Sequence, residues 1–365
     1  MPDPTPSSQE DIAKKRKRDG VSAGATLYVV LLSALTLFLP QHAAAAKNDF
    51  VWLVNGDRIT CDIKSLERGR LRVGTDSMGT VLLDWEDVVR LSSPDEYVVE
   101  LASGERFRGT LTDPGTEGQI GVLLANEETV LNMADVVWID PVKEGTFTDL
   151  WDGNVRVGLD YTKANNSSTF SGSFEARRRA EDFQVGIAAT AFLRSQDGAS
   201  DSRRANLELE YRRLLRQRRF RALVGQFERN DELGIDLRSL VGAGFGRFLV
   251  QTNRSLWAAT AGAAVVNEQR AGDQASENQI EAYLNTRHEY FLYHSPKTTL
   301  NTNLTLFPGL TDSGRIRGNL AFFLRRELIS DLFLELRLFG SYDNESPEEG
   351  AKSDYGLITS LGYSF

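Results

Sequence analysis

The sequence has 365 residues, a formal net charge of −9 and a mean hydropathy of −0.32. Its length suffices for two domains. Its hydropathy excludes a bundle of membrane-spanning helices but not a membrane β-barrel, whose strands alternate in polarity instead of running apolar. A single cysteine, Cys61, excludes an intramolecular disulfide, and together with the few histidines it leaves no Cys/His metal set.

Residues 1–46 are organised like a secretory signal peptide. Five consecutive basic residues, 14–18, precede an apolar run over residues 21–39, and the alanines at 43–46 offer a cleavage signal. We therefore predict cleavage after Ala46 or within the alanine run. Five basic and four acidic side chains would leave with the peptide, so the mature charge becomes −9 − (+1) = −10. The alternative is an uncleaved membrane anchor, because the apolar run approaches spanning length.

Residues 50–141 contain an internal duplication with an offset of 48 residues. Asn55-Gly56-Asp57-Arg58 corresponds to Ser103-Gly104-Glu105-Arg106, and residues 87–91 correspond to 135–139. Short apolar segments are joined by glycine turns, of which Asn55-Gly56 is a strong hairpin signal. We predict a tandem of small SH3-like or Sm-like β domains over residues 47–144, with copies at about 47–94 and 95–142. The copies should pack together, because one copy alone buries little core.

The expected core of the first copy consists of Ile59, Ile63, Leu66, Leu71, Val73, Val81 and Leu83. The tryptophans of the tandem are either binding-surface aromatics or, more simply, packing residues at a domain seam: Trp52, Trp85 and Trp138. The spacing of its acids fits turns and solvated strand faces better than catalysis: Asp57, Asp62, Asp84, Glu86 and Asp87.

From residue 145 onward, segments of period-two alternation recur to the C-terminus. In residues 353–365 the face that carries Tyr355, Leu357 and Leu361 is largely apolar, whereas the opposite face is mostly small and polar. About twelve such strands can be placed, although the facing of the fifth and sixth, near 219–228 and 235–249, stays open. Short turns and longer polar loops alternate between them, which is typical of outer-membrane barrels. We predict a transmembrane antiparallel β-barrel over residues 145–365 with both termini in the periplasm.

The motif residues 55–60, 63–66 and 83–85, followed by this barrel, resemble the YdiY-like family of salt-induced outer-membrane proteins (domain of unknown function 481). The last strand is similar to the C-terminal strand that the barrel assembly machinery recognises, with Tyr363 and Phe365 as the signal. The resemblance implies the outer membrane of a Gram-negative bacterium and a link to salt or osmotic stress. It supplies no catalytic residues. The duplication of the periplasmic module departs from a simpler layout, which leaves the role of the module open.

The alternation points a mixed set of charges into the barrel lumen: Arg156, Asp160, Glu175, Arg177, Glu208, Glu210, Arg212, Glu281, Arg287, Arg317, Glu335 and Arg337. In one interpretation these charges line a passive channel for ions or small solutes, which we favour on sequence grounds. In the other they pair and plug the barrel, which then anchors a module that binds the cell wall or an envelope protein. Whether opposite charges lie within pairing distance discriminates the two.

We expect the protein's partners to be outer-membrane lipid, the barrel assembly machinery, and peptidoglycan or a periplasmic protein. No cofactor, metal or nucleic acid is expected, and no enzymatic activity. A barrel-wall hydrolase is the remaining alternative, since His288 lies on the apolar face of its strand. An interfacial histidine is the simpler interpretation, because the sequence fixes no serine beside it.

Overall fold

The computed structural model describes residues 48–142, 150–163, 167–196, 202–231, 235–270, 276–312, 314–345 and 352–363. Contacts divide the chain at residue 46, and the described residues all belong to the second unit, Lys47–Phe365. The predicted signal peptide lies outside the described residues. Strands dominate the second unit, and no helix in the described part of the chain combines the length and the apolar character that a membrane span needs.

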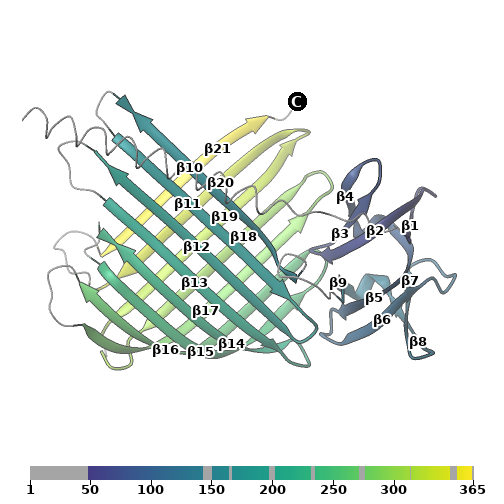
Figure 1. Ribbon diagram of the computed structural model, residues 1–365, viewed down its shortest axis with the longest axis horizontal. Coiled ribbons are helices and arrows are strands. Elements are labelled where there is room, and N and C mark those ends of the chain that lie inside the picture. Colours follow the sequence, from purple (N-terminus) through teal and green to yellow (C-terminus); the bar gives the residue numbers. More distant parts are fainter. Residues whose placement is uncertain are drawn as a thin grey trace, which may run out of the picture. The chain divides into compact units, whose positions relative to one another are not determined.

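The first part of the second unit, residues 48–142, is the repeat module. Its strands and single-turn 3-10 helices are β1 (Asp49–Leu53), β2 (Arg58–Glu67), β3 (Arg70–Thr75), β4 (Gly79–Asp84), η1 (Trp85–Asp87), β5 (Val88–Leu101), β6 (Arg106–Thr112), β7 (Gln119–Leu124), β8 (Glu127–Asn132), η2 (Met133–Asp135) and β9 (Val136–Pro141). They pair in the order β4-β3-β2-β1-β5-β6-β7-β8, and β9 pairs with both β2 and β5 (Figure 1).

The duplication appears directly in this topology. Residue for residue at the same offset, β4 and η1 return as β8 and η2. The long strand β5 belongs to both copies: its first half pairs with β1, and its second half pairs with β6 and β9. Gly56 and Gly104 take φ values of 89° and 84° in equivalent hairpin turns, which only glycine adopts without strain. In the first turn only Gly56 has a positive φ, because Asn55 keeps a negative φ.

One continuous apolar core fills both copies. Ile63, Leu66, Leu71 and Val73 are fully buried as predicted, and they cluster with Leu111, Ile120, Ile139 and other residues of the second copy. The remaining predicted core residues, Ile59, Val81 and Leu83, pack against this cluster while partly buried. Trp85 and Trp138 are buried, and the Trp85 indole donates a 2.8 Å hydrogen bond to the Met133 carbonyl. Of the tryptophans, these two are therefore packing residues.

The rest of the described chain forms the large sheet, in which each strand pairs antiparallel with the next (Figure 1). Its strands are β10 (Asp152–Thr162), β11 (Ser167–Arg179), β12 (Phe183–Ser195), β13 (Ser202–Leu214), β14 (Arg219–Asn230), β15 (Ile235–Gln251), β16 (Ser255–Arg270), β17 (Glu277–Leu292), β18 (Thr298–Pro308), β19 (Ile316–Ile329), β20 (Leu332–Asp343) and β21 (Ser353–Tyr363). Within the described residues this makes twelve strands, as predicted, with β10 and β21 at the edges. No ladder between these two edge strands occurs in that part of the chain.

The connections alternate between the two ends of the sheet, but the predicted alternation of length holds only in part, because 163–166 and 231–234 at one end are no longer than 215–218 at the other and shorter than 293–297 there. At one end of the sheet, β11–β12, β13–β14, β15–β16, β17–β18 and β19–β20 are joined by the short turns at 180–182, 215–218, 252–254, 293–297 and 330–331. We call this the short-turn end. The other connections meet at the opposite end, the loop end, and reach residues 309–315 and 344–352 in the longest cases.

Candidate functional site

The strand registers place every predicted lumen charge on one face of the large sheet, here called the polar face. Arg156 lies opposite Ser173, two residues from Glu175, and Glu208 lies opposite Ala188. Following the ladder across β14–β20 carries the same face to Glu281, Arg317 and Glu335. Because side chains alternate along a strand, residues at even spacing from these share the face.

The polar face encloses space. A cavity of about 850 Å³ is lined by strands that are far apart in the sheet, from Asn154 on β10 to Asn319 on β19. In a flat sheet these strands would be about 43 Å apart, at nearly 5 Å per strand, so the sheet must curl with its polar face inward. Six of the predicted charges line this cavity: Glu175, Arg177, Glu208, Glu210, Arg212 and Arg287.

The opposite face of the large sheet is apolar and exposed. Val155 and Leu159 on β10, Val241 and Phe245 on β15, and Leu361 on β21 each expose more than 60% of their surface. Apolar side chains continue across the intervening strands on the same parity. An exposed apolar area spread over a whole sheet face needs a partner or a lipid environment.

Charges at the loop end of the polar face are buried and paired. Glu268 is 6% exposed and lies 2.8 Å from both Arg238 and Arg270. Arg315, which is 3% exposed, lies 3.7 Å from Glu268 and 2.7 Å from Asp343. This loop-end network joins charges from β15, β16 and β20 with Arg315, the residue that precedes β19. Such an arrangement neutralises charges that burial alone would strongly disfavour.

Glu281 and Arg317 form a second buried pair below this network. The guanidinium donates two hydrogen bonds to the carboxylate, of 2.9 Å from Nε and 2.5 Å from Nη2. Glu281 is fully buried and Arg317 is 9% exposed. The Arg317 guanidinium also lies 5.0 Å from the centroid of the Phe307 ring. The two-pronged geometry holds both side chains across the β18 strand that lies between them in the sheet.

The other predicted charges lie in looser surroundings. Arg156 is 3.7 Å from Glu175, Arg212 is 2.7 Å from Glu210, and Glu335 is 3.4 Å from Arg325. Glu208 accepts a hydrogen bond from Asn206, Arg337 lies over the Phe323 ring, and Asp160 is exposed at the loop end. Of the predicted assembly signal, Tyr363 ends β21 with 65% of its surface exposed, and Phe365 lies outside the described residues.

At the short-turn end the polar face meets the repeat module. Glu100 on β5 is 1% exposed and lies between Arg106 of the module and Arg179 on β11, at 2.9 and 2.7 Å. Gln251 on β15 donates to the same carboxylate over 2.6 Å. Burial by itself would raise the pKa of Glu100, but Arg179 and Arg106 outweigh it and hold that pKa below its ordinary value.

Further ionic contacts widen this junction. Arg177 on β11 makes a two-pronged ion pair with Glu67 of β2, at 2.7 and 3.1 Å. Arg68 reaches Glu289 on β17, a carboxylate that also pairs with Arg287. Burial opposes the charged form of Glu67, yet the nearby arginines, Arg177 first, lower its pKa. A chamber of about 550 Å³ lies between these groups and the cavity-lining strands.

A serine and a histidine do meet on the outer face of the large sheet. Ser255 Oγ lies 3.1 Å from His288 Nε2, and the imidazole packs against the Trp257 ring at 6.1 Å. Across the ladder His288 faces Thr302. Among the described residues the His288 ring donates no hydrogen bond to a carboxylate or side-chain amide oxygen, so the pair lacks the third member that nucleophilic catalysis uses. The arrangement fits the interfacial interpretation of His288.

Several important charges were not among the predicted ones: Arg238, Glu268, Asp343, Glu289, Arg179 and Glu100. Glu268, Glu289 and Asp343 follow the same parity as the predicted residues, so extending the alternation to the strand ends would have found them. Glu100 carries no such signal, because its partners on β11 and β15 are remote in the sequence.

Comparison with known proteins gives one match. The family profile described as "Protein of unknown function, DUF481" matches residues 155–365, which is more than half of the chain. No curated protein matches the sequence. No solved structure matches it either.

Proposed function

The chain belongs to the DUF481 family, and from this, the exposed apolar face and the paired charges we propose that it is an outer-membrane β-barrel with a closed lumen. In this proposal the barrel anchors the repeat module in the periplasm, after export of the chain by a cleaved N-terminal signal. The curled sheet supports it, since a polar interior and an apolar exterior are what a membrane barrel requires.

The observation that carries the closed lumen is the burial of the charges near the loop end. The sequence alone favoured an open channel, and the criterion for choosing between an open and a closed lumen was whether opposite charges in the lumen pair. Glu281 with Arg317, and Glu268 with Arg238, Arg270 and Arg315, do pair. Glu281, Arg317, Glu268 and Arg315 are buried, whereas Arg238 and Arg270 are partly exposed. Removing one partner of a buried pair costs about 3–5 kcal/mol, because the other charge stays buried without compensation. We therefore expect these side chains to keep their paired positions across the lumen.

We assign the repeat module to two SH3-like barrels that share β5. Supporting this, each copy consists of short strands with a single-turn 3-10 helix before the last one, and its core is continuous with that of its neighbour. The module's ligand in this proposal is the cell wall or an envelope protein. Co-sedimentation with purified peptidoglycan, compared between the whole protein and a deletion of residues 47–145, separates these two partners.

Conductance in planar bilayers tests the closed lumen. The folded protein should be electrically silent across a salt gradient. The double variant Glu281→Ala/Arg317→Ala removes the buried pair together with its bulk, and should give discrete conductance steps. The matched control is Arg325→Ala/Glu335→Ala, a pair 3.4 Å apart whose arginine is 47% exposed, and it should stay silent. Each sample must first show the heat-modifiable migration of a folded barrel.

A passive channel for ions or small solutes is the second candidate, and the cavity of about 850 Å³ favours it. The same recordings decide: reproducible steps in the unmodified protein would overturn the closed lumen. The reversal potential would then show whether cations or anions pass more readily.

A further inference from the structure

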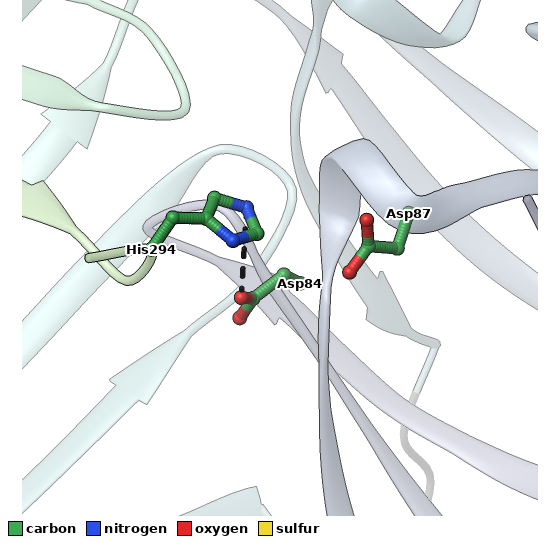
Figure 2. Close-up of side chains that lie close together, drawn as sticks. All are labelled: Asp84, Asp87 and His294. Carbon is green, nitrogen blue, oxygen red and sulfur yellow. Dashed lines mark ion pairs between the residues drawn. The ribbon is translucent and has the colours of Figure 1, made fainter. Parts of the chain in front are cut away.

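We propose that Asp84, Asp87 and His294 form a binding site for a divalent transition-metal cation of the Zn²⁺ class, at the junction of the repeat module and the large sheet. Each side chain offers one ligand atom, and these atoms all lie within 4.8 Å of one another. Figure 2 shows the imidazole above the Asp84 carboxylate, with the Asp87 carboxylate directed toward the same space. Imidazole with carboxylates is a ligand set that Zn²⁺ accepts.

The spacing is close to what one metal ion needs. His294 Nε2 lies 3.8 Å from Asp84 Oδ2. Two ligands at 2.0–2.2 Å from a tetrahedral zinc ion are about 3.4 Å apart, so this pair needs a contraction of a few tenths of an ångström, and the widest spacing in the set, up to 4.8 Å, needs one of up to about 1.4 Å. His294 is half exposed on the turn between β17 and β18, so its ring can make that adjustment by exchanging its contact with Glu86 for the ion.

Each carboxylate has an oxygen to offer. Arg70 Nε binds Asp84 Oδ1 at 3.1 Å, and the other oxygen, Oδ2, is the one that faces the histidine. Among the described residues the Asp87 carboxylate has no ion-pair partner. Glu86 contacts His294 Nε2 but also pairs with Arg254 at 2.7 Å, so it keeps a partner when the imidazole turns to a metal.

The duplication supplies an internal comparison. In the second copy Asn132, Ala134 and Asp135 occupy the positions of Asp84, Glu86 and Asp87. Asn132 acts as the N-cap of η2, since its side chain accepts a 3.0 Å hydrogen bond from the Ala134 amide. Asp84 precedes η1 in the same way, yet its side chain makes no capping bond. In the copy that meets His294, the corresponding carboxylate pairs with Arg70 through one oxygen and faces the histidine with the other.

The site is accessible and favourably charged. A groove of about 420 Å³ along the junction is lined by Asp84 and Glu86 but not by Asp87 or His294, so it reaches one of the three ligands. Three carboxylates, from Asp84, Glu86 and Asp87, face two guanidinium groups, from Arg70 and Arg254. The surplus negative charge attracts a cation. Because the ligands come from β4, η1 and the β17–β18 turn, a bound ion would tie the module to the large sheet.

Calorimetric titration of Zn²⁺ into the purified, untagged, chelator-treated protein tests the proposal. We expect one ion per chain, with millimolar Mg²⁺ unable to compete. His294→Gln and Asp87→Asn should each weaken binding at least tenfold. His288→Gln is the matched control, since it removes another histidine of the second unit, and should leave binding unchanged. Glu86→Gln should also retain binding.

Hydrogen exchange gives a readout that does not depend on affinity alone. Zn²⁺ should slow exchange in residues 84–89 and 292–297 of the unmodified protein, and should have no effect on these segments in His294→Gln. Equal melting temperatures in the absence of metal would show that the variants fold. The proposal is overturned if the unmodified protein shows no saturable binding at one ion per chain, or if His294→Gln and Asp87→Asn bind as tightly as it does.

Discussion

Glu100 is the residue whose replacement tests the junction most directly. Its carboxylate is 1% exposed and holds one arginine from each side of the junction, Arg106 and Arg179, with a hydrogen bond from Gln251. Glu100→Gln keeps the shape but removes the charge, which leaves two guanidinium groups partly buried without their counter-ion. Removing one partner of a buried pair costs about 3–5 kcal/mol. Every 1.4 kcal/mol is tenfold, so the docked state should lose at least about a hundredfold in its equilibrium constant.

Glu96→Gln is the matched control. Glu96 lies on the same strand, also pairs with an arginine, Arg108, at 2.8 Å, but both side chains are nearly half exposed. Exposed pairs contribute about 1 kcal/mol or less, so its effect should stay within about fivefold. Exchange of amide hydrogens in residues 136–141 and 180–183, followed by mass spectrometry, measures the opening of the junction on both sides.

A double-mutant cycle separates the junction from the module's own stability. Glu100→Gln and Arg179→Gln should couple by more than about 1 kcal/mol, because the second replacement removes the charge that the first leaves unpaired. If the two effects are additive, Glu100 acts only through Arg106 within the module, and the reasoning about the junction is wrong.

Three further predictions concern acid, packing and a buried hydrogen bond. The arginines around Glu67, Glu86 and Glu100 outweigh burial and hold the pKa of each carboxyl below its ordinary value of 4.5. The contribution of these carboxylates to docking is therefore complete above pH 4.5 and is lost as the pH falls through their lower pKa values in the docked state. Hydrogen exchange at the junction should be constant from pH 7 to about 5 and rise below about 4.5, whereas a rise centred near pH 6.5 would contradict this assignment. Gly262→Ala should lower the midpoint of urea unfolding by an amount worth about 1–3 kcal/mol, since a Cβ there meets the Ala243 carbonyl oxygen, while Gly186→Ala, which meets open space, should leave the midpoint unchanged. Trp85→Phe should cost the module about 0.5–1.5 kcal/mol in thermal or urea unfolding, because the Met133 carbonyl then keeps only the hydrogen bond from the Val136 amide, and an unchanged unfolding midpoint would show that the indole hydrogen bond adds nothing to stability.

Period-two alternation made most of the large sheet predictable, and the strands where it failed show why. The facing of β14 and β15 was open from sequence, and their ladders carry register shifts between Glu228 and Asn230, between Ile235 and Leu237, and between Phe248 and Val250. A shift of one residue moves every later side chain to the other face, so simple parity no longer applies. Arg238 keeps the parity of Leu240 and Gly242 and was missed because the facing of its strand had been left open.

The composition of β15 added to the ambiguity. Gly242, Gly244 and Gly246 occupy consecutive positions on the polar face, where the alternation has no polar side chain to reveal. Their backbone approaches neighbouring atoms so closely that an added Cβ would overlap them, as with the Ala261 carbonyl oxygen beside Gly244. These three positions require a residue without a side chain, and a pattern of polar and apolar residues does not reveal that requirement.

The repeat module was predictable in its duplication and core, because each copy carries the same turn glycines and apolar spacing. Its contacts with the large sheet were not. The sequence assigned Glu86 to turns and solvated strand faces and gave no signal at Glu67 or Glu100, and only the fold brings Arg254, Arg177 and Arg179 to these three acids. Ion pairs across 79 to 168 residues of chain leave no local pattern. The prediction that the protein binds no metal likewise considered only sets of Cys and His ligands, whereas the proposed site combines one histidine with two aspartates.

The duplication itself acquires a mechanical reason from these contacts. The first copy reaches the large sheet through Glu67, Arg68 and Glu86, and the second through Glu100 and the Val136 carbonyl, which accepts a 2.8 Å hydrogen bond from Asn253. A single copy would hold the sheet through a few polar contacts that water and salt weaken. The copies cannot turn independently, because β5 runs through both and β9 pairs with β2 of the first. Two joined copies contact the large sheet at separate points and therefore resist rotation of the module relative to the sheet better than a single copy would.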